Sequence, residues 1–539
     1  MKKVLKSKNV FTGLKELPHP AAILVEGNKI MKVASSIEEL NVSTDESVEV
    51  YDFEDQLIMP GIHDFHLHLF PGALQLESVD LSQTKSAEEV IQTLQNEWKH
   101  HQDKKWLIGF GWDNGAWEDS TLPSKELLDE YFPDHPVILN HLECHYCLVN
   151  SAALNLAGIT KDTEDPSFGE IVKDDKGEVT GILMEKAQSL VQRLAYNFNK
   201  EDKMRMLNNF FSYLAQHGVT SINDMYAPFS EFLDEFDLLY EIENNQGLKA
   251  RVHLQTKMDG DLTSAKEYLE RYNHPKLKMN GLKQFIDGVI TGHTAYMLED
   301  YSDVSHRGDT TYPVEDLENW IVEADKEGLS VRLHAIGDGA VKFSLDAFEK
   351  ARKLNGNQNG NQNTRHTIEH IECIRDEDIP RFKELNVIAS VQPYHLAALE
   401  QQVYMEKLGE ERFKNTYLNR TFLDAGAVVA IGSDFPVVHV SPMKEIFHAV
   451  TRKDSTMIDC WNEDEKFTMS ETLKAYTSAP AFGCFREDEL GTLEEGKLAD
   501  IIALSNNLFE IEHERILNTK VVFTMCDGNV VHELRDVTV

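Results

Sequence analysis

The stretch PGIHDFHLH, residues 60 to 68, places two histidines one residue apart at the end of an apolar run. On a β-strand, residues i and i+2 lie on the same face, so the imidazoles of His66 and His68 point in the same direction. That arrangement suits metal chelation, and it equally suits an ordinary strand with one polar face. The rest of the chain decides between these interpretations, because a metal site needs further ligands.

Length, composition and charge exclude several classes of protein. The 539 residues are 41% hydrophobic and 27% charged, a globular composition long enough for two or three structural units. No apolar run approaches the ~20 residues of a membrane-spanning helix, and the lysine-rich start lacks the apolar stretch of a signal peptide. The 53 basic and 91 acidic residues give a net charge of −38, which argues against binding to nucleic acid or an anionic membrane. Six cysteines are too few for a disulfide framework, so we expect a cytoplasmic protein.

Both ends of the chain are rich in short β-type runs separated by turns. AAILVEGNKIMKVA carries a hairpin signal at Gly27-Asn28, and KVVFTMCDGNVVHE carries another at Asp527-Gly528. We therefore expect residues 1–58 and 484–539 to form one small β-sandwich domain from both termini.

The middle of the chain, residues 59–483, alternates helical stretches with short apolar runs, which predicts a parallel sheet covered by helices. Nine candidate strands lie near 58–66, 136–140, 219–224, 250–256, 281–287, 330–336, 365–370, 386–392 and 427–433. A (β/α)8 barrel needs eight. Segment 136–140 lies within a distinctive aromatic and glycine-rich region, so we assign 70–212 to an insertion after strand 1. The asparagine-rich segment 355–363 is expected to be a solvated connection.

Polar side chains of metal-binding type recur at the ends of the predicted barrel strands, where barrel enzymes build their active sites. Each one alone has an ordinary structural explanation, such as a helix cap or a hydrogen-bonded core residue. Together they predict a metal centre at one mouth of the barrel. The candidates are His66 and His68 on strand 1, Lys283 on strand 4, His334 on strand 5, His370 on strand 6 and Asp434 on strand 8.

Several motifs resemble those of the metal-dependent amidohydrolase superfamily. They are PGIHDFHLH, LHAIGD, IEHIE and GSDFPV, and the match is closest to the YtcJ-like branch that includes N-substituted formamide deformylase. GFGWDNGAWEDSTLP, GILMEKA, LKQFIDGVITGHTA and LGTLEEGKLADIIAL resemble further segments of that branch. The resemblance covers nearly the whole chain and implies a (β/α)8 metallohydrolase.

By that resemblance, a divalent metal, with zinc as the expected ion, is held in one or two copies. His66 and His68 would hold one ion, His334 and His370 a second, and Asp434 would contact the metal and the attacking water. A carboxylated Lys283 would bridge two ions. An unmodified Lys283 packed along the barrel wall or paired with Asp287 is the alternative, and Glu185 is a rival carboxylate ligand.

The implied reaction is hydrolysis of a C–N bond in an amide, formamide or carbamate-like small molecule. A metal ion lowers the pKa of bound water to about 7, and Asp434 would act as general base and then general acid. The alternatives are a deaminase, an ester or lactone hydrolase, or a non-catalytic sensor on the same scaffold.

Residues for substrate binding are predicted from their places near the barrel mouth. His145 lies in the insertion and could close over the mouth, His293 follows strand 4, and Gln392 ends strand 7. Trp112 could line an apolar wall of the pocket. The expected binding partner is a small-molecule substrate. For the oligomeric state, a homodimer is one of the alternatives.

Overall fold

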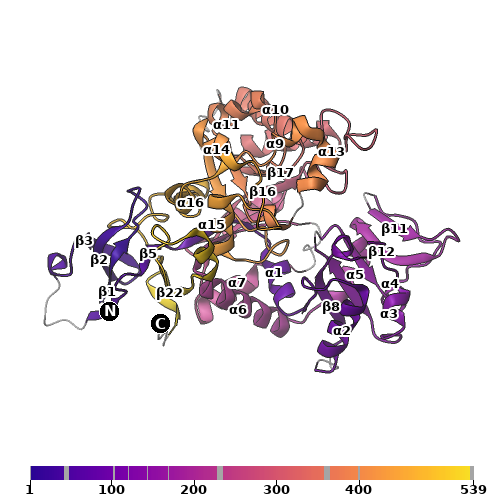
Figure 1. Cartoon of the computed structure of the whole chain (residues 1–539), viewed down its shortest axis with the longest axis horizontal. Coiled ribbons are helices and arrows are strands. Elements are labelled where there is room, and N and C mark those ends of the chain that lie inside the picture. The colour runs from indigo at the N-terminus through magenta and orange to yellow at the C-terminus, as the bar shows by residue number, and fades with distance from the viewer. Residues whose placement is uncertain are drawn as a thin grey trace.

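The protein consists of three parts in a row, with a terminal sheet at one end, a barrel in the middle and an inserted sheet at the other end (Figure 1). The structure, a computed structural model, describes residues 2–41, 48–100, 104–118, 120–142, 144–167, 169–227, 233, 235–356, 364–398 and 401–534. Of the asparagine-rich segment 355–363, residues 357–363 lie outside these ranges.

The middle part is a parallel barrel, as predicted. Within the described ranges its strand order is β20-β19-β18-β17-β16-β14-β13-β6. The strands are β6 (Ile62–Leu67), β13 (Val219–Met225), β14 (Arg251–Lys257), β16 (Leu277–Phe285), β17 (Val331–Ala335), β18 (Thr367–His370), β19 (Ile388–Val391) and β20 (Val428–Ile431). These correspond to the eight predicted barrel strands in the predicted order.

The barrel closes where the segment after β20 meets β6. Leu67 forms a parallel bridge with Phe435, Asp434 N donates to His66 O at 2.6 Å, and His68 N donates to Phe435 O at 2.8 Å. A Cβ atom at Gly432 would lie 2.3 Å from His66 N, so this contact requires glycine. The closure therefore brings Asp434 and the two histidines of β6 together.

Helices surround the barrel strands and follow them in the chain. The barrel helices are α6 (Lys200–Gln216), α7 (Asp237–Asn245), α8 (Thr263–Arg271), α9 (Val314–Lys326), α10 (Asp338–Asn355), α11 (Ile379–Leu385), α12 (His395–Ala398), α13 (Gln401–Phe413), α14 (Asn419–Asp424), α15 (Pro442–Thr451), α16 (Met469–Ala475) and α17 (Ser478–Gly483). A short strand, β15 (Asn273–His274), pairs antiparallel with β16. Helix α6 shows why such a segment is helical. The side chain of Asn199 caps its N-terminus by accepting a hydrogen bond from Asp202 N. Buried Met206, Phe210 and Leu214 recur at helical spacing and form its apolar face.

The insertion after β6 forms its own sheet, in the order β11-β12-β10-β9-β8-β7. Its strands are β7 (Val79–Asp80), β8 (Leu107–Trp112), β9 (Val137–His141), β10 (Tyr146–Val149), β11 (Gly169–Lys173) and β12 (Val179–Glu185), and its helices are α1 (Leu69–Leu76), α2 (Ala87–Trp98), α3 (Glu126–Asp129), α4 (Ser151–Ala157) and α5 (Ser189–Ala195). Segment 136–140 corresponds to β9 and is not a barrel strand, as predicted. Because α6 already belongs to the barrel, the barrel resumes at Lys200, earlier than the expected residue 212.

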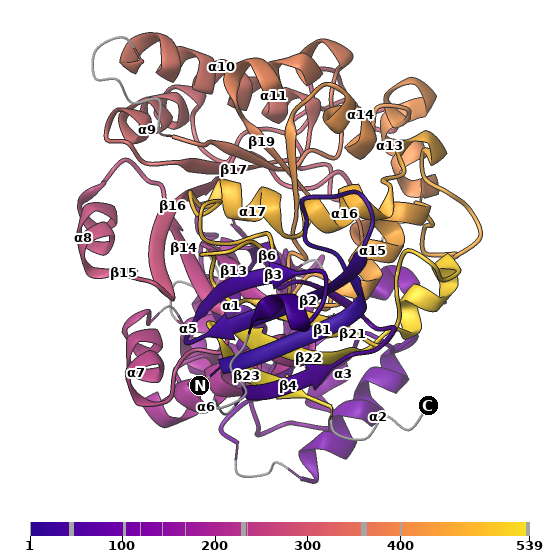
Figure 2. The same ribbon diagram turned by 90° about the vertical axis from the view of Figure 1, so that its left-hand side faces the viewer.

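The terminal part is a single sheet built from both ends of the chain, with the order β23-β22-β21-β5-β1-β2-β3 and β4 beside β1. Figure 2 shows the strands of the two ends side by side. Its strands are β1 (Lys2–Val10), β2 (His19–Glu26), β3 (Lys29–Ala34), β4 (Val48–Asp52), β5 (Leu57–Pro60), β21 (Ile501–Leu504), β22 (Val521–Cys526) and β23 (Asn529–Glu533). The rings of Tyr51 on β4 and Phe523 on β22 lie 4.9 Å apart although three strands separate β4 from β22 in the sheet. The sheet therefore folds over on itself, and its two halves face each other across a shared core, as in a sandwich.

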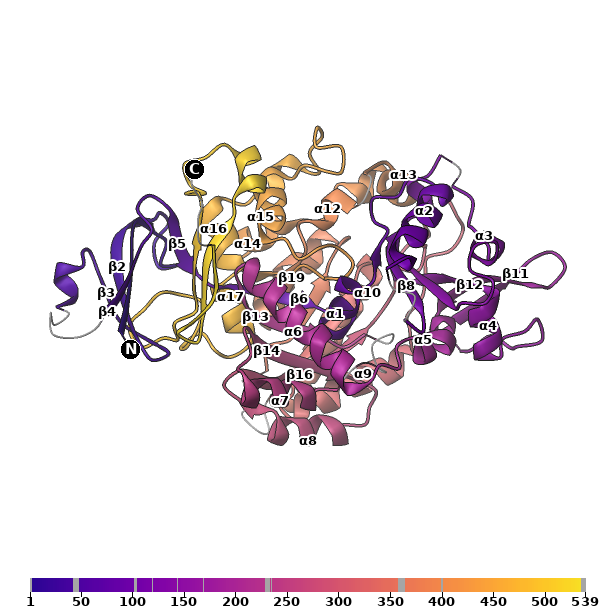
Figure 3. The same ribbon diagram turned by 90° about the horizontal axis from the view of Figure 1, so that it is seen from below.

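The terminal sheet packs against the N-terminal ends of the barrel strands. Arg251, at the start of β14, is fully buried and donates to Asp500 at 2.7 and 3.0 Å and to Asp527 at 2.8 Å. The inserted sheet lies at the opposite end of the molecule (Figure 3). The mouth formed by the C-terminal ends of the strands is thereby turned toward the insertion.

No helix in the described part of the chain is long and apolar enough to cross a bilayer. The cytoplasmic location and the homodimer stay predictions.

Candidate metal centre

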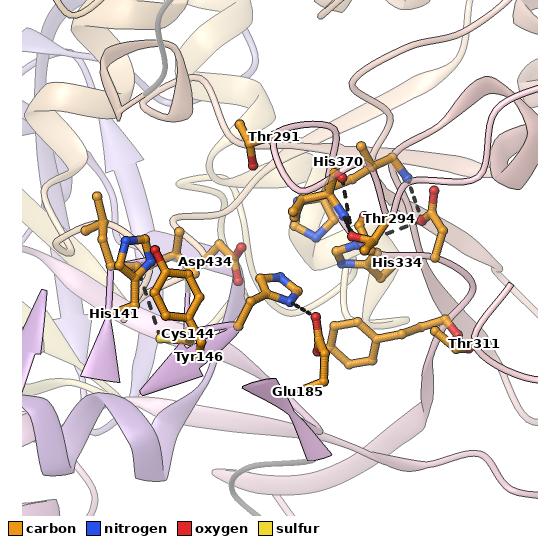
Figure 4. A pocket seen from close by; sticks show the side chains of 18 of the residues that line it. His141, Cys144, Tyr146, Glu185, Thr291, Thr294, Thr311, His334, His370 and Asp434 are labelled. Atoms are coloured by element: carbon orange, nitrogen blue, oxygen red, sulfur yellow. Dashed lines mark hydrogen bonds and ion pairs between the residues drawn. The ribbon is translucent and has the colours of Figure 1, made fainter. Parts of the chain in front are cut away.

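A cavity of about 900 Å³ lies between the C-terminal ends of the barrel strands and the insertion. Figure 4 shows His334 and His370 on one side of this space and His141 and Tyr146 on the other, with Asp434 and Glu185 between them. The barrel also contributes His66 and His68 to the lining, and the insertion contributes His145. Five of the six predicted metal-binding residues therefore line one cavity.

His66, His68 and Asp434 form the tightest group in the cavity. The Nε2 atoms of both histidines lie 3.2 Å from Asp434 Oδ1, and all three side chains are buried. Their ligand atoms lie within 4.8 Å of one another, close enough to hold one metal ion.

Hydrogen bonds on the far side of each ring fix how these histidines point. His66 Nδ1 donates to Glu369 Oε2 at 2.8 Å, and His68 Nδ1 donates to Met225 O at 2.8 Å. Because each Nδ1 atom is engaged in this way, both Nε2 atoms are aimed at the carboxylate oxygen of Asp434. A metal ion bound between these three atoms would take the place of protons on the two rings. Histidine metal ligands are typically held in this way.

Glu369 is itself held in place by a buried guanidinium. Arg332 Nε donates to Glu369 Oε1 at 2.6 Å, and Arg332 also donates to Phe65 O at 2.7 Å. Glu369 is fully buried, and although burial raises its pKa, the charge of Arg332 and the contact with His66 lower it well below the usual value. The carboxylate therefore stays charged and keeps its hydrogen bond to His66.

A second group shares Asp434 and contains a histidine that our sequence prediction missed. His370, His395 and Asp434 also have ligand atoms within 4.8 Å of one another. The rings of His334 and His370 lie 4.5 Å apart, and His334 Nε2 donates to Gly288 O at 3.1 Å. His395 follows Gln392 in SVQPYH, and its amide donates to Gln392 O at 3.0 Å. The sequence feature that could have identified His395 is its place in the first turn after the seventh predicted barrel strand.

The protonation states of these residues suit a divalent cation. Burial lowers the pKa of His68, His370 and His395, and it lowers that of His334 to about 3. Burial raises the pKa of Asp434, but contacts with His66 and His68 outweigh it and keep the pKa well below the usual range. His370 Nδ1 and His395 Nε2 are buried without a hydrogen-bond partner. Neutral imidazoles, one carboxylate and unpaired ring nitrogens form a donor set that fits a metal ion.

Lys283 lies on β16, fully buried, and no residue in the described ranges forms a hydrogen bond with its Nζ. Burial lowers its pKa to about 8. The alternative of a pair with Asp287 is wrong, because that carboxylate accepts instead from the amides of Tyr296, Ile336 and Gly337. Lys283 is thus an amine with substantial neutral population near pH 8, packed within the barrel.

The insertion supplies a histidine–carboxylate pair to the cavity. His145 Nδ1 donates to Glu185 Oε1 at 2.9 Å, a contact drawn as a dashed line at Glu185 in Figure 4. Glu185 adopts a φ of 49°, and its amide donates to His145 O at 2.8 Å. A left-handed backbone at a residue other than glycine is strained and is commonly found at functional sites.

Three of the predicted substrate-binding residues do not line the cavity. Trp112 is buried in the core of the inserted sheet, where its indole donates to Leu139 O at 3.0 Å. His293 is bound to Asp303 at 2.8 Å and lies 3.1 Å from Lys407 Nζ. Gln392 is buried at the end of β19. Trp112 packs into the core because large aromatic side chains bury a large apolar surface there.

His370 and Asp434 also adopt left-handed backbone conformations, with φ values of 72° and 59°. Such conformations persist where the surrounding structure imposes them. Asp434 is held by the hydrogen bond from its amide to His66 O, and the chain after His370 by the bond from Ile371 N to Ala335 O at 3.2 Å. Each of these two residues is thus held in place by a neighbouring strand.

Comparison with known proteins gives the family to which these features correspond. The profile described as "Amidohydrolase family" matches residues 49–532. The protein LONG AFTER FAR-RED 3 of Arabidopsis thaliana is 31% identical over 97% of this chain and 90% of its own length. The putative amidohydrolase YtcJ of Bacillus subtilis is 30% identical over 99% of this chain and all of its own length.

A relative of named activity and a solved structure extend the similarity. The N-substituted formamide deformylase of Arthrobacter pascens is 28% identical over 95% of both chains. The crystal structure of an uncharacterized metal-dependent hydrolase from Pyrococcus horikoshii superposes with a TM-score of 0.77 at 25% identity, over 95% of this chain and 99% of that one.

Proposed function

The chain belongs to the amidohydrolase family, and from this premise we propose that it hydrolyses an amide, N-substituted formamide or carbamate-like bond in a small molecule. Membership makes the protein a metal-dependent hydrolase acting on C–N bonds. The substrate class, the metal and the role of each residue are our proposal. The observation that carries it is the convergence of His66, His68 and Asp434 within 4.8 Å at the cavity.

The proposed centre holds two zinc ions. His66, His68 and Asp434 would hold one, and His334 and His370 the other. A divalent ion in such a site supplies a Lewis acid that polarises a carbonyl group and lowers the pKa of a water molecule to about 7. Imidazole and carboxylate donors also suit other transition metals, so the metal content must be measured.

Lys283 is the proposed bridge between the ions after carboxylation of its amine. The neutral amine attacks carbon dioxide, a C–N bond forms, and one proton is released, which leaves an anionic carboxylate on the side chain. Burial, the lack of a partner for Nζ and a pKa near 8 support this step. Glu185 is the weaker candidate for the bridge because it already accepts a hydrogen bond from His145.

Asp434 is the proposed proton carrier. Its carboxylate lies at the centre of the imidazole group and remains charged, so it can accept a proton from the attacking water. The same carboxyl group then donates that proton to the leaving nitrogen, which combines the general base and general acid roles. His395, whose Nε2 lies 3.8 Å from Asp434 Oδ2, is placed to orient a substrate oxygen.

The shape and lining of the cavity favour a substrate with an apolar substituent on nitrogen. About 900 Å³ is at the upper end of the range for small-molecule sites. The wall includes the aromatic rings of Tyr146, Tyr226, Phe285 and Tyr312. His145 and Glu185 offer a polar contact from the insertion.

An activity screen of the zinc-loaded protein tests the proposal. N-formyl, N-acyl and carbamoyl derivatives of aromatic and aliphatic amines are compared with heterocyclic amines, esters and lactones. We expect turnover of the first group to be the fastest, and loss of that turnover in Asp434→Asn. Asp303→Asn, which alters a carboxylate bound to His293 outside the cavity, is the matched control.

Preference for the heterocyclic amines or the esters would overturn the proposed substrate class. A protein that binds no stoichiometric metal under any loading would favour the sensor alternative instead.

A further inference from the structure

A second group of metal-binding side chains lies on the same barrel, away from the cavity. His63, His253 and Cys484 are all buried, and their ligand atoms lie within 4.8 Å of one another. None of the three lines the cavity. We propose that they form a second metal site, which holds one zinc-type ion at the floor of the barrel, with the side-chain oxygen of Asn223 as the fourth ligand. This inference is independent of the proposed function.

The floor site is built from neighbouring strands and a capping helix. His63 lies on β6, Asn223 on β13 and His253 on β14, which are adjacent in the barrel, and Asn223 is paired in register with His253. Cys484 immediately follows α17, which contacts β6 and β20. Figure 2 shows α17 on the side of the barrel that faces the terminal sheet. The four residues therefore come together only in the closed barrel.

The distances among the donor atoms are close to those of a tetrahedral site. Cys484 Sγ lies 3.8 Å from His63 Nε2 and 3.3 Å from Asn223 Oδ1, and those two atoms are 2.8 Å apart. Zinc bonds of 2.0–2.3 Å at tetrahedral angles separate ligand atoms by about 3.3–3.6 Å. A shift of a few tenths of an ångström in Asn223 is enough to admit the ion.

The hydrogen bonds of these residues also leave a ligand position open. His253 Nδ1 donates to Ile222 O at 3.1 Å, so its Nε2 carries the lone pair, and that atom is buried without a partner. A buried polar atom without a partner destabilises the folded protein, and a metal bond at Nε2 would remove this penalty. In the metal-free site His63 Nε2 donates to Asn223 Oδ1 at 2.8 Å. Metal binding at Nε2 would therefore break this hydrogen bond and move the ring proton to the buried Nδ1.

The protonation states of His63, His253 and Cys484 are compatible with metal binding. Burial lowers the pKa of His63 to about 3 and that of His253 well below the usual value, so both rings are neutral. Burial raises the pKa of Cys484 to about 11, so binding must displace the thiol proton. The occupied site would contain a divalent ion and one thiolate, with a net charge of +1.

The surroundings tolerate that charge because the nearby guanidinium groups are neutralised. Each has a carboxylate partner within 3 Å: Arg332 with Glu369, Arg251 with Asp500, and Arg486 with Glu489. A thiolate with two imidazoles is a donor set typical of zinc. Because the cluster is closed off by α17, the ion would stabilise the barrel and have no contact with substrate.

Cobalt is the probe that distinguishes the floor site from the catalytic centre. The full-length protein is produced in cobalt-supplemented medium, because a buried site must be loaded during folding. Only a sulfur ligand produces a thiolate-to-cobalt charge-transfer band in the near ultraviolet, and the proposed catalytic ligands contain no sulfur. We expect this band in the wild type and in Asp434→Asn, and its loss, with one metal equivalent, in Cys484→Ser.

Two cysteine variants serve as matched controls. Cys526→Ser alters another buried free thiol, and Cys144→Ser alters the thiol that lines the cavity; both should keep the band. Absence of the band from the wild type overturns the proposal, as does its loss in Cys144→Ser with retention in Cys484→Ser.

A measurement without mutation covers the case in which Cys484→Ser fails to fold. X-ray absorption of the zinc-loaded wild type should show a sulfur atom at about 2.3 Å from part of the zinc. His253→Gln should remove one metal equivalent together with this sulfur signal. A spectrum with nitrogen and oxygen ligands alone rules the floor site out.

Discussion

The two ends of strand β6 carry the same residue type in different settings. His66 and His68 lie at the C-terminal end, beside a cavity of about 900 Å³, whereas His63 lies near the start, beside a void of about 10 Å³. At the mouth the imidazoles converge on the carboxylate of Asp434, and at the floor His63 meets an amide and a thiol.

The difference shows how two groups of buried histidines in one barrel are placed in different surroundings. The side chains of both groups lie close enough together to hold a metal ion. Of these two groups, only the one at the mouth contains a carboxylate and borders a cavity with room for a small molecule. The following predictions test this contrast.

The largest expected effect is that of Asp434→Asn on turnover. The amide can neither accept nor donate the proton, and general acid–base catalysis contributes about 10²–10⁴-fold. We expect kcat/KM to fall by about this factor, measured at equal metal content. Wild-type turnover in this variant would contradict the proposed role of Asp434 as proton carrier.

Lys283→Met tests the burial of an unpaired amine at the mouth. Since the pKa of Lys283 is about 8 in the folded protein and 10.5 ordinarily, the unfolded chain binds more protons between these values, and stability rises with pH across that window. At pH 7 the buried charge destabilises the metal-free protein by about 3 kcal/mol. Lys283→Met should therefore be more stable at pH 7, and the difference should vanish above about pH 10.5.

Urea unfolding of metal-free protein in bicarbonate-free buffer measures this difference. Lys276→Met is the control, because its buried Nζ donates to Leu248 O at 2.9 Å. That variant should be destabilised at both pH values. Equal behaviour of the two variants would contradict the unpaired state of Lys283.

Glu369→Gln tests whether the fixed orientation of His66 matters for metal binding. Loss of such a supporting carboxylate typically reduces metal affinity or activity by about 10–100-fold. We expect a fall of this size in zinc affinity by competition with a chelator. Asp325→Asn, which alters a carboxylate 3.1 Å from His366 away from the mouth, should leave the affinity unchanged.

Cys484→Ser should have the smallest effect on catalysis. Because none of the residues of the floor site lines the cavity, kcat/KM should stay at the wild-type value. The thermal midpoint of the metal-loaded protein should fall by a few degrees as the stabilising ion is lost. A loss of turnover comparable with that of Asp434→Asn would contradict the proposal that the floor site has no role in catalysis.

Local patterns were sufficient to predict the barrel strands and five of the side chains that line the mouth. Strand ends can be recognised from consecutive residues, and His66, His68, His334, His370 and Asp434 all lie at such ends. Trp112 shows the limit of local patterns. Its strand could be recognised from neighbouring residues, but the direction of its side chain, into the core of the inserted sheet instead of the cavity, depends on packing.

Residues that act through distant partners were not predictable in this way. Glu369 was visible in IEHIE, but its contacts with His66 and Arg332 join residues 303 and 37 positions away. His293 lies in a loop whose partner, Asp303, turns it away from the cavity.

The amino-acid sequence alone determined the fold class, the family and the chemical nature of the mouth, because hydrophobic periodicity and short motifs are properties of neighbouring residues. Only the tertiary structure decided that PGIHDFHLH contributes to two sites. Closure of the barrel places His66 and His68 beside Asp434, and the packing of α17 against β6 places His63 beside Cys484, more than 400 residues away. Such contacts depend on strand register and barrel closure, which no single segment of the chain encodes.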